Sequence, residues 1–104
     1  MKFNNMTTTD IRKALKKIGY SIRLNWKTDY GHRRVNAEYT LKKDKQFGGA
    51  YINVWYYVNV KEVIDLTYMQ QTKFGILNIV NCKTLQDFEN CLKELNTLNK
   101  QNTL

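Results

Sequence analysis

The sequence predicts an α+β fold, a two-layer sandwich in which a mostly antiparallel sheet of about 4–5 strands carries the N- and C-terminal helices on one face. The middle of the chain alternates apolar and polar residues, which is typical of strands with one covered face. Each end of the chain instead carries one segment with a single apolar stripe of helical period. Because each helix has only one such stripe, the simplest packing places both on the same face of the sheet.

The first predicted element is a helix over residues 7–18, TTTDIRKALKKI. Thr7 and Asp10 are spaced as a capping box, and apolar residues recur every three or four positions behind them. Gly19 is a natural end for this helix. The face opposite the apolar stripe is basic and carries Arg12, Lys13, Lys16 and Lys17.

Two strands follow, over residues 20–27 and 34–42, and the short turn TDYGHR between them predicts an antiparallel hairpin. The face that we expect the helices to cover carries Ile22, Leu24, Trp26, Val35, Tyr39 and Leu41. The opposite face carries Arg23, Asn25, Lys27, Arg34, Asn36 and Thr40.

The third strand, residues 51–60, reads YINVWYYVNV and follows a predicted loop, KDKQFGG. One set of alternating residues, including Ile52, Val54 and Val58, belongs to the covered face. The other set is aromatic and polar, too apolar for a bare water-facing surface and too polar for a core. Its members are Tyr51, Asn53, Trp55 and Tyr57.

Residues 61–73 fit either a helix or a strand, and their many β-branched and aromatic residues favour a strand. Residues 74–81 predict a further strand. The last element is a helix over residues 85–98, with Thr84 and Asp87 as its capping box.

We expect a single domain over residues 1–104, with flexible ends at residues 1–6 and 99–104. No segment resembles a signal peptide or a membrane span of about 20 apolar residues, and the two cysteines form no disulfide framework. A cytoplasmic protein without a membrane partner is expected. The abundance of Lys, Asn, Ile and Tyr, with no proline, is typical of AT-rich coding and indicates a phage, a mobile element or a low-GC bacterium.

The net charge of +8 is placed unevenly along the chain. Residues 1–48 hold twelve basic against four acidic side chains, whereas residues 49–104 hold five of each. Such asymmetry favours a polyanionic partner, and nucleic acid is the first candidate.

The predicted uncovered sheet face places an aromatic row beside a basic row. Single-stranded nucleic acid is bound by this combination, because cations follow the phosphates while the bases stack on rings. We therefore expect a small basic binding protein, not an enzyme, whose partner is nucleic acid or a nucleoprotein complex. The expected contacts on this face are Arg23, Lys27, Arg34, Tyr51, Trp55 and Tyr57. An auxiliary phosphate contact is expected from Lys13, Lys16 and Lys17.

Other interpretations stay open for the same face. A second protomer could cover it in a homodimer, or it could contact a host protein, as a phage-type inhibitor of a host nucleic-acid-handling or defence nuclease would. Cross-strand pairing alone also favours aromatic residues on sheets.

The helix and the following GYSIRLNWKTDYGHRR resemble the start of the HicA messenger-RNA-cleaving toxins, over residues 10–41. That family places a histidine after a glycine in a hairpin behind a short helix. The resemblance implies a metal-free RNase that uses His32, although the family's Gly-Ser-His run is here Gly31-His32 without the serine.

No other segment carries a catalytic or cofactor pattern. One histidine and two cysteines cannot form a zinc site of ordinary spacing, and Gly48-Gly49 lacks the P-loop pattern, so we expect neither a metal nor a cofactor. Cys91 lies on the apolar stripe of the last helix. Cys82 precedes that helix, where a thiol pKa can be lowered, and we interpret both thiols as structural.

Overall fold

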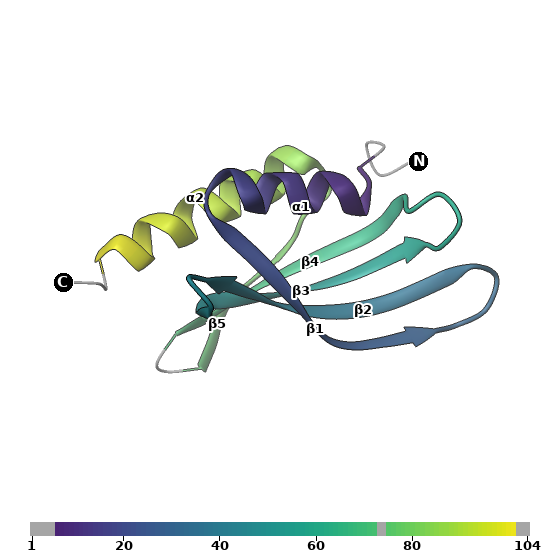
Figure 1. Ribbon diagram of the computed structural model, residues 1–104, viewed down its shortest axis with the longest axis horizontal. Coiled ribbons are helices and arrows are strands. Elements are labelled where there is room, and N and C mark those ends of the chain that lie inside the picture. The colour runs from purple at the N-terminus through teal and green to yellow at the C-terminus, as the bar shows by residue number, and fades with distance from the viewer. Residues whose placement is uncertain (1–5, 73–74, 102–104) are drawn as a thin grey trace.

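The computed structural model describes residues 6–72 and 75–101, and within them the chain forms five antiparallel strands between two helices. The strands are β1 (Tyr20–Asp29), β2 (Arg34–Lys43), β3 (Gln46–Tyr57), β4 (Val63–Thr72) and β5 (Gly75–Asn81). The helices are α1 (Thr8–Lys17) and α2 (Leu85–Gln101). The strands lie in the sheet in chain order, β1-β2-β3-β4-β5. Both helices lie on the same side of this sheet (Figure 1), which confirms the predicted α+β architecture.

The sheet therefore has a helix-covered face and, on the other side, a face without helices that we call the open face. The segment with two interpretations, residues 61–73, forms strand β4. Because it is a strand, it adds polar and apolar side chains to the open face beside those of β3.

Both predicted capping boxes are present. At α1, Asp10 N donates to Thr7 Oγ1 (3.2 Å) and Thr7 N donates to Asp10 Oδ2 (2.9 Å). At α2, Asp87 N donates to Thr84 Oγ1 and Thr84 N donates to Asp87 Oδ2, each at 3.1 Å. Each box satisfies backbone N–H groups that a helix cannot pair internally, so the sequence fixes both helix starts.

The core lies between the helices and the covered face. Its largest fully buried side chains include Tyr68 and Leu66 from β4 and Phe88 from α2. Met6 was expected in a flexible end, but it is also buried, and its backbone oxygen accepts a hydrogen bond from Val63 N (2.8 Å). At the other end α2 continues to Gln101, past the predicted limit of residue 98. The remainder of the two expected flexible ends, residues 1–5 and 102–104, lies outside the described residues.

The predicted loop KDKQFGG is largely part of a strand, because β3 begins at Gln46. Gly48 lies within β3 at a point of very close packing. A Cβ atom built there would lie 2.8 Å from the Tyr20 ring and 2.9 Å from the Leu41 carbonyl oxygen. The Gly48-Gly49 pair therefore marks a close approach and a shift of register beside β2, where the sequence indicated only a chain reversal.

A β-bulge in β1 changes which side chains of its second half lie on the open face and which lie on the covered face. The register with β2 shifts between Leu24 and Trp26, so that Asn25 is the extra residue. Trp26 then pairs with Glu38 on the open face, and Lys27 pairs with Ala37 on the covered side. The prediction that Trp26 is covered and Lys27 is uncovered was wrong, because one inserted residue moves every later side chain to the other face.

Two further residues expected beneath the helices are exposed. Leu24 keeps its expected face but is 49% exposed, since the helices do not cover this part of β1. Val58 is also 49% exposed, because β3 ends at Tyr57 and Val58 lies in the turn that follows.

Candidate nucleic-acid interface

The open face has a basic and aromatic end next to the β1–β2 turn. Arg34 lies opposite Tyr57 in β3. On its other side lies Tyr30, whose backbone N–H donates to Arg34 O (3.0 Å). Residues opposite one another across strands share a face, with Cβ atoms about 5 Å apart. Tyr30 is 53% exposed, Tyr57 is 38% exposed and Arg34 is exposed. The face therefore presents one guanidinium group flanked by two accessible phenol rings.

Trp55 lies two residues before Tyr57 in β3 and therefore on the same face. Its ring centroid is 5.0 Å from that of Tyr30, and the two planes are inclined by 39°. Trp55 is partly buried, and its cross-strand partners are Asn36 and Asp65. The bulge adds a second indole to the open face, that of Trp26, which is 42% exposed.

A network of uncharged and acidic side chains occupies the centre of the open face. Asn25, the bulge residue, accepts a hydrogen bond from Thr40 Oγ1 (2.8 Å) and donates to Glu38 Oε2 (3.1 Å). Asn36 Nδ2 donates to Asn53 Oδ1 (2.8 Å). The side chain of Asn25 thus bonds two residues of β2, which fixes the bulge in place.

The far end of the open face carries a second group of cations and rings. Arg23 and Tyr51 lie in one cross-strand row with Thr40 between them. The ring of Phe47 lies 5.2 Å from that of Tyr51, and Phe47 is 49% exposed. Lys42 lies opposite Phe47. Two cations and two rings therefore lie at this end, separated from the Arg34 end by the polar network.

The structure brings together most of the residues predicted for the face. The open face holds Arg23, Arg34, Tyr51, Trp55 and Tyr57, whereas Lys27 lies on the other side of β1. Sequence reasoning missed Tyr30 and Trp26. Nothing in the sequence marks the bulge that moves Trp26, and Tyr30 lies in the segment that we interpreted as a turn.

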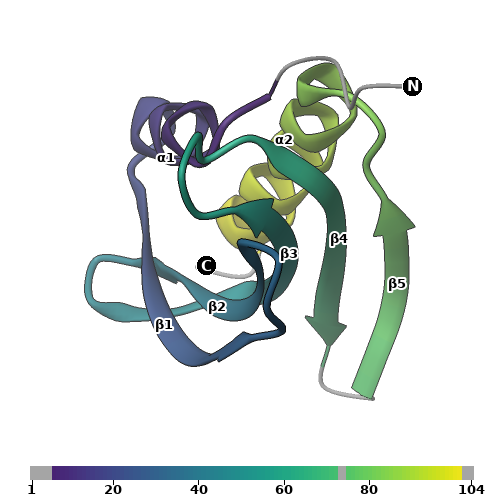
Figure 2. The ribbon, with the colours of Figure 1, turned by 90° about the vertical axis from the view of Figure 1, so that its right-hand side faces the viewer.

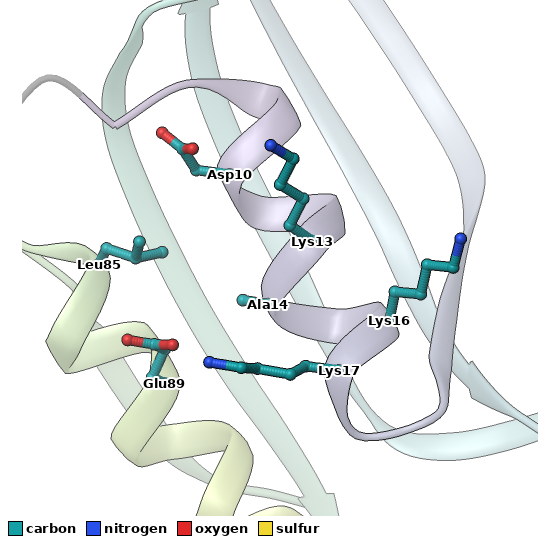
Figure 3. Close-up of a pocket in the computed structure, with 7 residues that line it drawn as sticks. All are labelled: Asp10, Lys13, Ala14, Lys16, Lys17, Leu85 and Glu89. Carbon is teal, nitrogen blue, oxygen red and sulfur yellow. The ribbon is translucent and has the colours of Figure 1, made fainter.

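The lysines of α1 lie in the helix layer, on the opposite side of the sheet from the open face. They border a groove of about 480 Å³ between α1 and α2. The residues that line the groove are Asp10, Lys13, Ala14, Lys16, Lys17, Leu85 and Glu89. In Figure 3 the Lys17 side chain points across the groove toward the Glu89 carboxylate. Lys13, Lys16 and Lys17 therefore do not border the surface on which the aromatic rings lie.

Among the residues that the structure describes, the remaining reactive side chains do not gather into a second site. His32 is exposed in the β1–β2 turn, with a left-handed backbone (φ 52°). The Sγ atoms of Cys82 and Cys91 lie 3.9 Å apart, both thiols are buried, and burial raises the pKa of each. Cys82 therefore does not gain a lowered pKa from the helix that follows it. No three His, Cys, Asp or Glu side chains in the described ranges are grouped so that they could hold a metal ion.

Comparisons of this chain with models of protein families, with curated proteins and with solved structures find no match. Neither of the helices in the described part of the chain is long and apolar enough to cross a membrane.

Proposed function

We propose that this protein binds single-stranded nucleic acid on the open face of its sheet, at the end formed by Tyr30, Arg34, Trp55 and Tyr57. The supporting observation is the cross-strand row in which Arg34 lies between two exposed tyrosines, next to Trp55. A guanidinium group pairs with phosphate through two parallel hydrogen bonds. Exposed rings beside it offer surfaces on which bases can stack.

A single strand suits this surface better than a duplex. Rings can stack only on bases that are free of their own stacking partners, as in single-stranded segments. The neighbouring polar network contributes amide groups, among them those of Asn25 and Asn53, that can donate to and accept from base edges. Binding then combines one charge contact with stacking, and does not depend on a continuous basic surface.

The test is fluorescence anisotropy with labelled single-stranded RNA, single-stranded DNA and duplex DNA, from about 50 to about 200 mM salt. We expect single strands to bind more tightly than the duplex, with affinity that falls as salt rises. Trp55→Ala should weaken binding roughly 5- to 150-fold, which corresponds to ~1–3 kcal/mol for one stacked base. Absence of binding at the lowest salt, or affinity independent of salt, would refute the proposal and favour a protein partner.

Substitutions of two matched arginines distinguish binding at a local site from general attraction by net charge. Arg34 and Arg12 are both exposed, but Arg12 lies on α1 in the helix layer. Arg34→Ala should weaken binding at least several-fold more than Arg12→Ala. Equal losses would mean that net charge, and not the open face, attracts the strand.

The same samples test the RNase interpretation that involves His32. Binding without chemistry leaves the oligonucleotide intact after incubation. Cleavage that is lost in His32→Ala, with binding retained, would instead assign a catalytic function.

A further inference from the structure

The outer edge of β5 has backbone groups directed away from the sheet. β5 is an edge strand in the described sheet and forms its outer boundary in Figure 2. Cys82 N donates to Leu66 O (2.8 Å), and bonding alternates along an antiparallel pair. Ile79 and Asn81 are therefore the residues whose N–H and C=O groups turn away from β4, toward the open edge.

The two edges of the sheet differ in how they are protected from pairing with another strand. Natural edge strands are usually interrupted by bulges or carry charges, lysine above all. β1 has both kinds of protection, since the bulge at Asn25 interrupts it and Arg23 and Lys27 flank the bulge. β5 also has a register shift against β4, between Ile76 and Asn78 near its start. Its sequence, GILNIVN, has however no charged residue and no proline, and Ile79 is 65% exposed.

We propose that β5 pairs with β5 of a second copy of this chain, antiparallel about a two-fold axis. In such a pair each residue faces a residue of the same strand, so a charged residue near the axis would face its own copy. An uncharged strand avoids this repulsion. The excess positive charge lies in residues 1–48, and this pairing keeps the two basic halves at opposite ends of the dimer.

The helix layer leaves space for the second copy beside β5. A groove of about 530 Å³ lies between α2 and the last two strands. It is lined by Gln70, Asn78, Lys93, Glu94, Thr97 and Leu98. Leu98 is 38% exposed there, and Lys93 and Glu94 give the groove one charge of each sign. A two-fold axis can bring a cation of one copy to the anion of the other, so the groove wall suits a second copy of itself.

The test is sedimentation equilibrium of the full chain over a wide range of protein concentration. We expect a reversible shift from 12.4 kDa to about twice that mass. Ile79→Lys should abolish the dimer, because it adds a positive charge to each of the two paired strands, close to the two-fold axis. Ile79→Pro should also abolish it, because it removes an outward N–H group that β4 does not use.

The matched control is Ser21→Lys, which adds the same charge on the open-face side of the opposite edge strand, where Ser21 is exposed. This variant should dimerise as the wild type does, and circular dichroism checks that all variants are folded. A wild type that stays at 12.4 kDa at every concentration would overturn the proposal. A dimer that survives Ile79→Lys but is lost in Trp55→Ala would overturn it too, and would place the interface on the open face.

Discussion

The ring of Tyr30 packs against the ring of Trp55, with their centroids 5.0 Å apart. Tyr30 follows β1, whereas Trp55 belongs to β3, so this contact passes over β2 and joins the turn to a strand that is not its hairpin partner. We expect the two rings to be coupled by ~0.5–1.5 kcal/mol in the free energy of unfolding. A double-mutant cycle with Tyr30→Ala and Trp55→Ala, measured by urea denaturation, gives this coupling directly. The coupling is contradicted if the losses of unfolding free energy in the two single variants sum to the loss in the double variant within about 0.3 kcal/mol.

Trp26 and Phe88 should differ sharply in their contribution to stability, although both are large aromatic residues. Phe88 is fully buried, so Phe88→Ala should cost ~3–5 kcal/mol through lost contacts and a cavity. Trp26 lies on the open face after the bulge, so Trp26→Ala should cost no more than about 1 kcal/mol. Urea denaturation of the two variants checks this order. A cost at Trp26 that approaches the cost at Phe88 would mean that Trp26 is covered and the bulge is absent.

Gly48 and Gly19 are needed for different physical reasons. Substitution of each glycine by alanine and by asparagine distinguishes the two reasons. Gly19 has φ +81° with open space around it, so Gly19→Ala should cost about 1–2 kcal/mol and Gly19→Asn, which tolerates a left-handed backbone, should cost less.

At Gly48 the obstacle is the Tyr20 ring and the Leu41 carbonyl, so any Cβ atom crowds the site. Gly48→Ala should cost ~1–3 kcal/mol, and Gly48→Asn should cost more because the side chain is larger. The free energy of unfolding in urea measures all four variants. If Gly48→Asn is more stable than Gly48→Ala, as expected at Gly19, then backbone strain and not crowding is the reason for the glycine at position 48.

Stability should fall at alkaline pH. Burial raises the pKa of Tyr68 above its ordinary value of 10.0 and the pKa of Cys82 above 9.0. Above pH 9 the unfolded chain therefore loses protons that the folded chain keeps, and the free energy of unfolding decreases as pH rises. Urea denaturation should give a constant free energy from pH 7 to about pH 8.5 and a decline above it.

Tyr68→Phe removes one of the buried groups that titrate. Above about pH 10, the free energy of unfolding of this variant should therefore decline less steeply with pH than that of the wild type. Tyr57→Phe removes an exposed phenol and serves as the control. An identical decline in Tyr68→Phe and wild type would show that the Tyr68 hydroxyl does not cause the loss.

Local patterns were sufficient to predict the architecture. The capping boxes at Thr7 and Thr84 each combine a hydroxyl with an acid three residues later, and such a signal acts within one helical turn. The alternation of β2 and of residues 51–57 in β3 placed Tyr51, Trp55 and Arg34 on the open face, because strands have a strict period of two.

The errors lie where the structure depends on contacts that are distant in sequence. The bulge at Asn25 is fixed by hydrogen bonds to Thr40 and Glu38, about fifteen residues away, and no glycine marks it. How far the helices extend over the sheet is set by packing, so the exposure of Leu24 could not be predicted from its alternation. The contact of Tyr30 with Trp55 likewise forms only once three strands are assembled.

The strands follow one another in the sheet as they do along the chain, and this order has a consequence during synthesis on the ribosome. Each strand that emerges finds its partner already present in the strand before it, so pairing closes only short loops and can proceed quickly. The core, however, needs Phe88 and Leu92 from α2, which is made after all five strands. Until then the nascent chain exposes the apolar surface of β3 and β4, a state open to aggregation that the arrival of α2 ends.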